Sequence, residues 1–509
     1  MSGLQNDEVL PGDRVAVHAP LSRIAIPGLG FISATEKLLF FLFLLTLPLA
    51  NPWVRGDGVG YYAYLRSALI DHDLRFENDF LSANESFLIS RVDAQGHLLP
   101  RLYTKTGYIE NHFTVGPAIL WAPVILAVHG SVLLADHFGA HVAADGYSHP
   151  YLLAMAIASA CYGFLSLFLT YRIAQKYFEA QWSFCATIAI WMASSLPVYM
   201  YFNPSWSHAL SAFTVALFLW YWERTKLHRN TGQWAVLGVL AGLMGNVYYP
   251  NIILLIFPAL EVFTLWRAKQ RYSNQPAIPI QKLVLSCCAF VFAFFAALLP
   301  TLVTRQIIYG SPFETGYPAM STWNWTSPVL LKVLFSSDHG LFSWTPVLIL
   351  AVVGLPFLIK RDALLGTGSM LTFLAFYYFI ASYPDWDGIS SFGNRFFVSL
   401  TPIFILGLVA SLGSFSNWLS KTTRAFVIAT PLLVFFIAWN TGFIFQWGTH
   451  MIPARGEISW STMIRNQFIE VPKRMTHGLE TYFTHRGQMM QRIEQEDIEQ
   501  QKAYEIPEK

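Results

Sequence analysis

Residues 36–65 read EKLLFFLFLLTLPLANPWVRGDGVGYYAYL, an apolar run that ends in a polar turn at residues 55–58. A helix needs about 20 mostly apolar residues to cross a bilayer, and residues 36–54 supply that length. The polar segment 1–35 precedes the run, whereas a signal peptide begins with only a short basic region. We therefore expect a retained first transmembrane helix, with Asp57 just beyond its end.

The whole chain has the composition of a membrane protein. Hydrophobic residues make up 54% of the 509 residues and charged residues only 13%, about half the charged share of an ordinary soluble domain. The net charge of +2 gives no indication of a nucleic-acid partner. With ten further apolar runs, the sequence predicts an all-α polytopic membrane protein of about 11 transmembrane helices. The predicted spans are residues 36–54, 150–171, 181–202, 207–222, 233–248, 250–265, 283–304, 342–359, 364–382, 396–413 and 425–445.

One more apolar run, residues 113–135, is also long enough to span, and its course decides on which side every later loop lies. Short loops rich in lysine and arginine stay in the cytoplasm. If the run does not cross and the N-terminus is cytoplasmic, sixteen basic residues fall on the cytoplasmic side, whereas crossing would move every later basic loop to the other side. We therefore expect a kinked or surface-lying helix, consistent with Gly116, Pro117, Pro123 and Gly130. The sixteen basic residues are Arg14, Arg23, Lys37, Arg172, Lys176, Arg224, Lys226, Arg229, Arg267, Lys269, Arg271, Lys282, Lys360, Arg361, Lys421 and Arg424.

This topology divides the chain into three parts. We expect residues 1–35 to form a cytoplasmic N-terminal segment, 36–445 a transmembrane domain, and 446–509 an extracytoplasmic tail. The last stretch of this tail, from about Arg486, is rich in Gln and Glu and is predicted to be helical or partly disordered. The first extracytoplasmic loop, 55–149, is long. It opens with residues 59–70, where Tyr and Leu side chains recur at helical spacing and predict a helix lying at the membrane interface.

Polar side chains gather in the predicted extracytoplasmic loops, and such groups are costly near a membrane, so they suggest function. Each has an ordinary alternative. Asp57 between two glycines could be a turn or a helix cap, His208 a hydrogen-bonded interface residue, and Arg395 a partner for a nearby aspartate. Glu110 and His112 are too short a signal for a metal site by themselves. What favours function is that all of them open onto one face of the membrane.

Three stretches make the chain similar to a known family. The apolar first helix followed by DGVGYYAYLRSALIDHDL (57–74) resembles the GT-C superfamily of membrane glycosyltransferases, which includes protein O-mannosyltransferases and the bacterial aminoarabinose transferase. KTGYIENHFTVGPAILWAP (105–123) is similar to the second loop-helix element of that family, and YRIAQKYF (171–178) to the pattern that follows it. The resemblance covers about residues 36–265 in layout. One departure is that many relatives carry two adjacent acids in the first loop, whereas Asp57 is flanked by glycines.

The resemblance implies a GT-C-like fold and an extracytoplasmic reaction. A sugar would move from a polyprenyl-phosphate donor to a lipid, glycan or protein acceptor, usually with inversion at the anomeric carbon. The cations available for the donor phosphate at the headgroup level are, in order of preference, Arg395, Arg305 and Lys105. A partly desolvated carboxylate can take the acceptor proton, and we expect Asp57 to be this base. Further candidates for substrate contact are Tyr61, Tyr62, Asn111, Asp338, His339 and Asp387.

A divalent metal ion is the one cofactor that the sequence suggests. Its predicted ligands are Glu110 or His112 together with His208, whereas the glycines beside Asp57 leave no paired acid there to hold an ion. Membrane lipids surround the predicted protein, and the family resemblance favours the bacterial inner membrane, with the N-terminus cytoplasmic.

The main alternative is a transporter or flippase of a lipid-linked or small polar substrate. Secondary transporters place ionisable groups near the bilayer midplane and often have repeated halves. Charges in the middle of the predicted spans are nearly absent here and no internal repeat is visible, so a glycosyltransferase is preferred. A glycan polymerase or ligase would share the donor and the side of the membrane but differ in fold detail.

Overall fold

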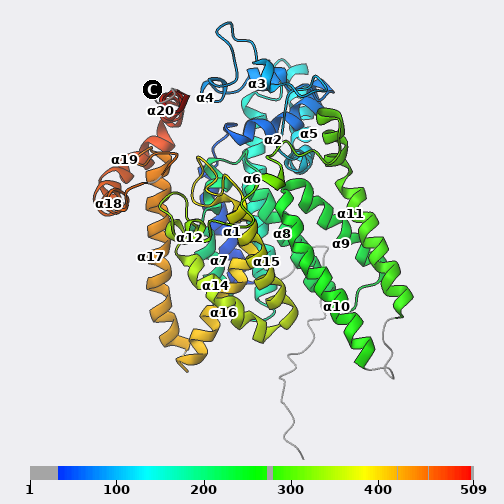
Figure 1. The fold of residues 1–509 in the computed structure, drawn as a ribbon. Coiled ribbons are helices and arrows are strands. Elements are labelled where there is room, and N and C mark those ends of the chain that lie inside the picture. The colour runs from blue at the N-terminus through cyan, green and yellow to red at the C-terminus, as the bar shows by residue number, and fades with distance from the viewer. Residues whose placement is uncertain (1–32, 272–278, 421, 457, 506–509) are drawn as a thin grey trace, which may run out of the picture.

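The computed structural model describes residues 33–271, 279–420, 422–456 and 458–505 (Figure 1). These residues are mainly helical, and two isolated β-bridges lie in the loop between α4 and α5. All but the last three residues of the predicted N-terminal segment 1–35 lie outside the described residues. The α-helices are α1 (Ala34–Thr46), α2 (Asp57–Arg66), α3 (Glu77–Leu81), α4 (Glu85–Leu88), α5 (Gly116–His137), α6 (His149–Ala174), α7 (Ala180–Ala193), α8 (His208–Thr225), α9 (Thr231–Val247), α10 (Ile256–Arg271), α11 (Ile280–Tyr309), α12 (Leu330–Phe335), α13 (Leu341–Trp344), α14 (Val347–Arg361), α15 (Ala363–Ser382), α16 (Thr401–Trp418), α17 (Thr422–Gly448), α18 (Trp460–Arg465), α19 (Val471–Thr484) and α20 (Arg486–Glu505). The 3₁₀ and π segments are η1 (Leu47–Leu49), η2 (Ser67–Asp71), η3 (Pro100–Leu102), η4 (Val198–Phe202), η5 (Tyr249–Leu255), η6 (Met320–Thr322), η7 (Arg395–Leu400) and η8 (Asn466–Glu470).

The predicted all-α polytopic architecture is confirmed, and each predicted span coincides with helical structure. Within the described ranges, seven helices are long and apolar enough to cross a membrane. They are Gly116–His137, His149–Ala174, Tyr249–Arg267, Ile280–Tyr309, Ala363–Ser382, Arg395–Trp418 and Thr422–Gly448. Six of these coincide with predicted spans, and Gly116–His137 is the run predicted not to cross. The other predicted spans coincide with the shorter helices α1, α7, α8, α9 and α14.

Helix α5 contains the apolar run 113–135, which the distribution of basic loops predicts not to cross the membrane. Near its start, Trp121 donates from Nε1 to Ser159 at 2.9 Å. Further along, His129 lies 2.7 Å from the hydroxyl of Tyr151. The order of these contacts makes α5 antiparallel to α6 and places it beside the first half of that helix.

Charged contacts fix which helix ends lie together. Glu36 at the start of α1 forms an ion pair with Arg172 in the last turn of α6. The end of α1 and the start of α6 therefore lie at the same end of the bundle. The segment that joins them, including α5, begins and finishes at that end. We call the end of the bundle that carries α2 the site end, and the end at which α6 finishes the basic end. Figure 1 shows α2 and α3 at one end and the turn between α16 and α17 at the other.

At the basic end, cations from the predicted cytoplasmic loops have carboxylate partners. Lys226 lies 2.6 Å from Asp362, which joins the loop after α8 to the turn between α14 and α15. Arg229 and Glu261 form a fully buried pair at 2.8 Å. These residues therefore contribute packing between helix ends, in addition to the topology role that the sequence suggests.

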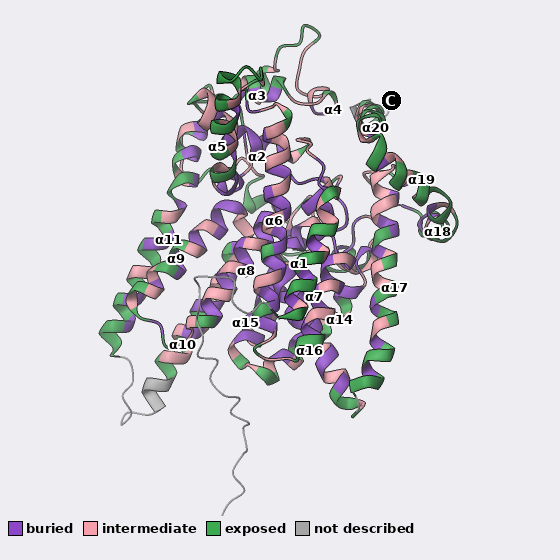
Figure 2. Cartoon of the chain, turned by 180° about the vertical axis from the view of Figure 1, so that it is seen from behind, coloured by how far each residue is buried: buried purple, intermediate pink, exposed green. Residues whose placement is uncertain are grey.

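Helix α16 is the centre of the bundle. In the apolar stretch of Arg395–Trp418, which includes α16, 83% is buried, against 28% in the apolar stretches of α11 and α17. These two helices lie at the outside of the bundle (Figure 2). Gly407 of α16 meets Gly354 of α14 so closely that a Cβ on either would overlap backbone atoms of the other helix. Small residues permit such backbone approach in membrane proteins, where helices gain little from leaving lipid. The central helix is preceded by η7, so a rigid element carries Arg395.

The predicted interfacial helix is present as α2, but protein covers it. All residues from Gly58 to Leu65 are buried. The Tyr62 hydroxyl donates to the carbonyl of Gly146 at 2.6 Å, and the Tyr64 hydroxyl donates to that of Asn111 at 3.0 Å. The segments before α5 and before α6 thus close over the face that the sequence assigned to the membrane interface.

The C-terminal tail returns to the site end in its described part. Helix α20 places Glu494 against α4, where the carboxylate accepts from Asn84 at 2.8 Å and from the backbone of Ser86 at 2.7 Å. Arg486 donates to the carbonyl of Ala50, just after the first helix, at 2.8 Å. The tail is therefore helical and forms one wall of the site end.

Candidate functional site

Asp57 opens helix α2 after a strained turn. Gly56 has a φ of +53°, in the left-handed region that favours glycine. Trp206 holds this turn by donating from Nε1 to the carbonyl of Arg55 at 3.0 Å. An acidic side chain in the first turn of a helix is stabilised by the helix dipole. The turn therefore fixes the position of Asp57, and its carboxylate is free to pair with another side chain.

That partner is Arg395, at the start of η7. Oδ2 of Asp57 lies 2.8 Å from Nη1 of Arg395, and the two side chains are 26% and 11% exposed. The guanidinium also lies over the Trp206 ring, 4.5 Å from its centroid, while the Arg395 Nε has no hydrogen-bond partner. Two residues to which the sequence assigned complementary roles therefore meet in a partly desolvated position.

The glycines that follow Asp57 permit close packing. A Cβ on Gly58 would overlap the Ser205 side chain, and a Cβ on Gly60 would overlap the Phe113 ring. No larger side chain fits at either position unless its neighbour moves. The absence of a second acid beside Asp57 therefore has a packing reason.

Tyrosine hydroxyls surround the Asp57–Arg395 pair. Ser207 donates to the Tyr61 hydroxyl at 2.9 Å. Burial raises the pKa of Tyr61, and the nearby charge of Asp57 raises it further. Burial also raises the pKa of Tyr383, which the charges of the neighbouring carboxylates reinforce. Both phenols stay protonated at neutral pH and can donate to ligand oxygens.

Arg305, the second predicted phosphate ligand, has a different role. Its guanidinium donates to the carbonyls of Asn111 at 2.7 Å, His112 at 2.8 Å and Phe113 at 2.7 Å. It also donates to the Tyr249 hydroxyl at 2.8 Å, and the residue is 2% exposed. Arg305 thus holds the loop before α5 against the end of α11 by hydrogen bonds. This geometry does not support the predicted phosphate contact. The loop folds back over α11, which no local pattern in the sequence indicates.

Several predicted substrate contacts also have structural roles. Asn111 donates from its side chain to the carbonyl of Gly60 at 2.9 Å and is buried. Tyr62 is held by its bond to the loop before α6. Lys105 is exposed, and Tyr61 is the predicted contact that adjoins Asp57.

The predicted metal ligands Glu110, His112 and His208 are not brought together as a ligand set. The ring of His112 lies 4.9 Å from that of Tyr317, and burial lowers the pKa of His112 to about 4, so the ring is neutral at pH 7. The ring of His208 packs 4.6 Å from that of Tyr199. The two histidines therefore serve as aromatic packing residues, and the predicted metal set is not supported.

Another trio does converge. Across the described part of the chain, one group of three or more His, Cys, Asp and Glu side chains could hold a metal ion, formed by Asp338, His339 and Asp387. One ligand atom from each lies within 4.8 Å of the others. The sequence predicts these residues as substrate contacts, whereas their convergence on one point makes them candidate metal ligands.

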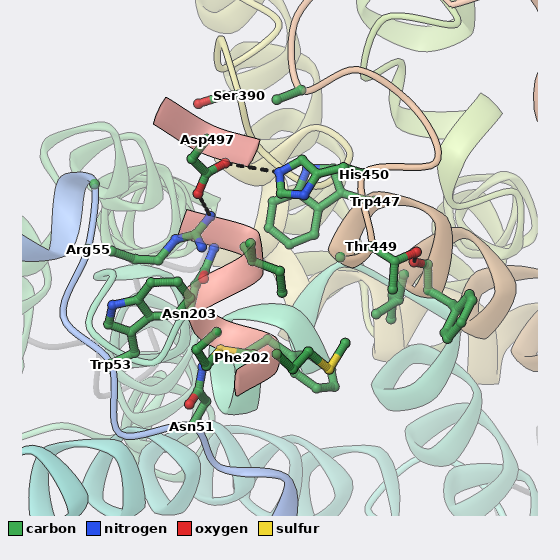
Figure 3. Close-up of a pocket in the computed structure, with 18 of the residues that line it drawn as sticks. Asn51, Trp53, Arg55, Phe202, Asn203, Ser390, Trp447, Thr449, His450 and Asp497 are labelled. Carbon is green, nitrogen blue, oxygen red and sulfur yellow. Dashed lines mark hydrogen bonds and ion pairs between the residues drawn. The ribbon is translucent and has the colours of Figure 1, made fainter. Parts of the chain in front are cut away.

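A cavity of about 260 Å³ lies between the bundle and the C-terminal helices (Figure 3). Gly56 and Trp206 line it, so it reaches the turn that holds Asp57. Arg55 lies 3.3 Å from Asp497 of α20, and Asp497 lies 2.9 Å from Nε2 of His450. Apolar lining residues include Leu49, Phe202, Ile444, Leu479, Met489 and Ile493.

None of the predicted site residues lines this cavity. Arg55 stands two positions before Asp57, so its closeness to the predicted base in the sequence could have identified it. Trp206 lies in the polar turn before α8, where an aromatic residue gives no signal of its own. Asp497 is one of several acids in a charged helix and is indistinguishable from them until α20 is seen to return to the bundle.

Comparison with known proteins gives one family match. Residues 149–294 match the family model described as dolichyl-phosphate-mannose-protein mannosyltransferase, from the start of α6 into α11. The match confirms the predicted resemblance to GT-C membrane glycosyltransferases, and its range contains the stretch 171–178, whereas 57–74 and 105–123 lie before it. No curated protein matches the chain.

Among solved structures, the archaeal oligosaccharyltransferase AglB from Archaeoglobus fulgidus, in complex with an inhibitory peptide and a dolichol-phosphate, is 13% identical. That alignment covers 86% of this chain and 54% of the other, with a TM-score of 0.47. The apo form of the Archaeoglobus fulgidus oligosaccharyltransferase gives 14% identity, the same coverages and a TM-score of 0.42. The chain spans about half the length of these oligosaccharyltransferases.

Proposed function

We propose that this chain, similar over residues 149–294 to GT-C mannosyltransferases, transfers a sugar from a polyprenyl-phosphate donor to an extracytoplasmic lipid, glycan or protein acceptor. The observation that carries the proposal is the pairing of Asp57 with Arg395 beside a largely apolar cavity. A carboxylate and a guanidinium in one partly desolvated site supply the base and the phosphate contact that the reaction needs.

Arg395 is the proposed ligand of the donor phosphate. It directs one nitrogen at Asp57, while its Nε has no hydrogen-bond partner. A planar guanidinium can bind two phosphate oxygens at once and stabilise the negative charge that grows on the leaving phosphate. Arg395 would therefore bind the donor and lower the barrier for breaking the anomeric carbon–oxygen bond.

Asp57 is the proposed general base. The acceptor hydroxyl or amine attacks the anomeric carbon, the bond from that carbon to the phosphate oxygen breaks, and polyprenyl phosphate leaves. The acceptor proton moves to the carboxylate of Asp57. Protonated tyrosines such as Tyr61 and Tyr383 can donate to the sugar hydroxyls and orient the ring.

The cavity beside Asp57 is the proposed site of the first isoprene units. Its apolar lining comes from the end of the first helix, from α17 and from α19 and α20. An isoprenoid tail buried there would leave its phosphate near the turn at Gly56. The tail would continue into the bilayer.

The proposed orientation places the site end outside the cytoplasm. The described basic loops lie at the opposite end, and short basic loops remain cytoplasmic. We infer the inner membrane of a bacterium, with the start of α1 on the cytoplasmic side.

The test compares cells that lack the protein with cells complemented by wild-type or Asp57→Asn protein. Mass analysis of surface glycans and glycolipids should show one sugar missing in the deletion strain, restored by wild type and not by Asp57→Asn. A matched control is Asp136→Asn, which removes an exposed carboxylate near the end of α5 and should restore the sugar. Equal restoration by Asp57→Asn would disprove the base assignment, and an unchanged glycan profile in the deletion strain would count against the whole proposal.

A further inference from the structure

The cluster of Asp338, His339 and Asp387 lies outside the transfer chemistry described above. We propose that it binds a divalent transition-metal ion, zinc or manganese, which fixes the loop that leads to Arg395. The metal site does not depend on the proposed function, and only its effect on Arg395 rests on it.

His339 gives the strongest support. The residue is 0% exposed, and neither ring nitrogen has a hydrogen-bond partner. Leaving a buried polar group unpaired is costly, so such a group normally has a hydrogen-bond partner or another group that satisfies it. A metal ion would satisfy one nitrogen and explain why this imidazole is buried.

The contact between His339 and Asp338 has the geometry of two ligands of one ion. Nδ1 of His339 lies 3.2 Å from Oδ1 of Asp338, within ion-pair distance, and neither atom has a hydrogen bond. Ligand atoms that each lie about 2.0–2.2 Å from an ion stand roughly 3–3.5 Å apart. The pair is therefore spaced for a shared ion.

The backbone at His339 is held in a rare conformation. Its φ is +55°, in the left-handed region that non-glycine residues seldom adopt. Ser343 braces the turn by donating to the carbonyl of Gly340 at 3.1 Å, and the Trp344 ring packs 5.0 Å from the imidazole. Strain of this kind persists where the surrounding structure enforces it, often at functional sites.

Asp387 brings the third ligand from a different part of the fold. It lies in the loop between α15 and η7, whereas the other two ligands lie in the turn between α12 and α13. The next residue, Gly388, has a φ of +74°, and a Cβ there would lie 3.2 Å from the Arg395 Nε. An ion held by all three side chains would tie the two segments together and fix the backbone against which Arg395 rests.

The donor set selects the class of metal. One imidazole nitrogen and two carboxylates suit zinc, manganese or iron, whereas magnesium and calcium prefer oxygen ligands alone. Three protein ligands leave at least one coordination position for water or another oxygen. Asp387 is half-buried, so an ion could enter the cluster from its side.

The experiment measures bound metal in the full chain, purified in detergent without chelator. Elemental analysis after incubation with Zn²⁺ or Mn²⁺ and gel filtration should give about one equivalent per chain for wild type. Asp387→Asn and His339→Gln should reduce this at least tenfold. Asp385→Asn, a carboxylate removed two positions away, should retain the metal.

Two further measurements keep the result interpretable if a variant folds poorly. Thermal melting of wild type should rise by several degrees when Zn²⁺ or Mn²⁺ is restored to chelated protein, and melting of Asp387→Asn should not respond. Binding of synthetic polyprenyl phosphate should weaken on chelation if the ion positions Arg395. Wild-type protein with no bound metal and no melting response, or full metal retention by His339→Gln, would overturn the proposal. A bound metal with unchanged phosphate binding would leave the site in place and reject its effect on Arg395.

Discussion

Two arginines at the site end show how similar sequence signals lead to different roles. Arg305 ends a long helix, is 2% exposed and donates to three carbonyls and one tyrosine. Arg395 precedes the central helix, pairs with one carboxylate and has an unpartnered Nε. A cation saturated by carbonyls has little capacity to bind a ligand, whereas one that faces a single acid can exchange partners. The number of hydrogen-bond partners that each guanidinium already has therefore distinguishes the two arginines.

The largest expected effect is on transfer by Arg395→Gln. Loss of the guanidinium removes the contact with the leaving phosphate, and such preorganised donors are worth about 10²–10³-fold in rate. Arg395→Lys keeps the charge without the fork and should recover only part of the rate. The measurement is the amount of the sugar restored per folded protein in complemented cells.

The Arg395→Gln result is contradicted if transfer stays within about twofold of wild type. Arg75→Gln is the matched control, because it removes a guanidinium at an exposed position in the segment between η2 and α3. Its effect should be much smaller than that of Arg395→Gln.

Arg305→Gln should instead act on stability. It leaves the carbonyls of His112 and Phe113 without their donor, and each unpaired group costs about 1–3 kcal/mol. The carbonyl of Asn111 loses one of its two donors and keeps the Tyr64 hydroxyl. We expect a lower melting temperature and a lower yield of folded protein. The affinity of the folded fraction for synthetic polyprenyl phosphate should remain close to wild type. A normal melting temperature with lost phosphate affinity would reverse the two roles.

The sequence predicted the helices well because apolar runs and basic loops each carry local information. It also linked Asp57 with Arg395, since both are charged residues in loops on the same predicted face. It could not separate Arg305 from Arg395, because saturation depends on where the loop before α5 folds. Likewise Asp338 and His339 are far from Asp387 in the chain, so only the packing of two loops reveals that the three converge.

Gly58→Ala should have an intermediate effect and tests the packing explanation for the missing second acid. Its Cβ would overlap the Ser205 side chain, and overpacking of this kind costs about 1–3 kcal/mol. The double variant with Ser205→Gly removes the obstructing atoms and should recover much of the lost stability. Thermal melting of the two single variants and the double variant measures this coupling. Strictly additive losses would mean that the contact does not explain the glycine.

The smallest expected effect concerns the wall formed by α20. Asp497 is held between Arg55 at 3.3 Å and His450 at 2.9 Å, with Glu496 on the other side of the same imidazole at 2.8 Å. Burial opposes its charge, but Arg55 and His450 prevail and lower the pKa of Asp497. A carboxyl whose pKa is lower in the folded state stabilises at neutral pH and loses that contribution as the pH falls below about 4.

Asp497→Asn should therefore loosen α20 at pH 7 by about 1 kcal/mol or less, in the range of a partly exposed ion pair. Hydrogen exchange of the α20 amides, corrected for intrinsic rates, should be faster in the variant at pH 7 and converge with wild type in acid. Glu494→Gln, which acts on α4 rather than on Arg55, is the comparison that separates the two contacts. If wild type and Asp497→Asn keep the same difference across the whole pH range, the Arg55–Asp497 contact is not what holds the wall. The wall would then depend on the contacts of Glu494 with α4 and of Arg486 with the carbonyl of Ala50, together with apolar packing.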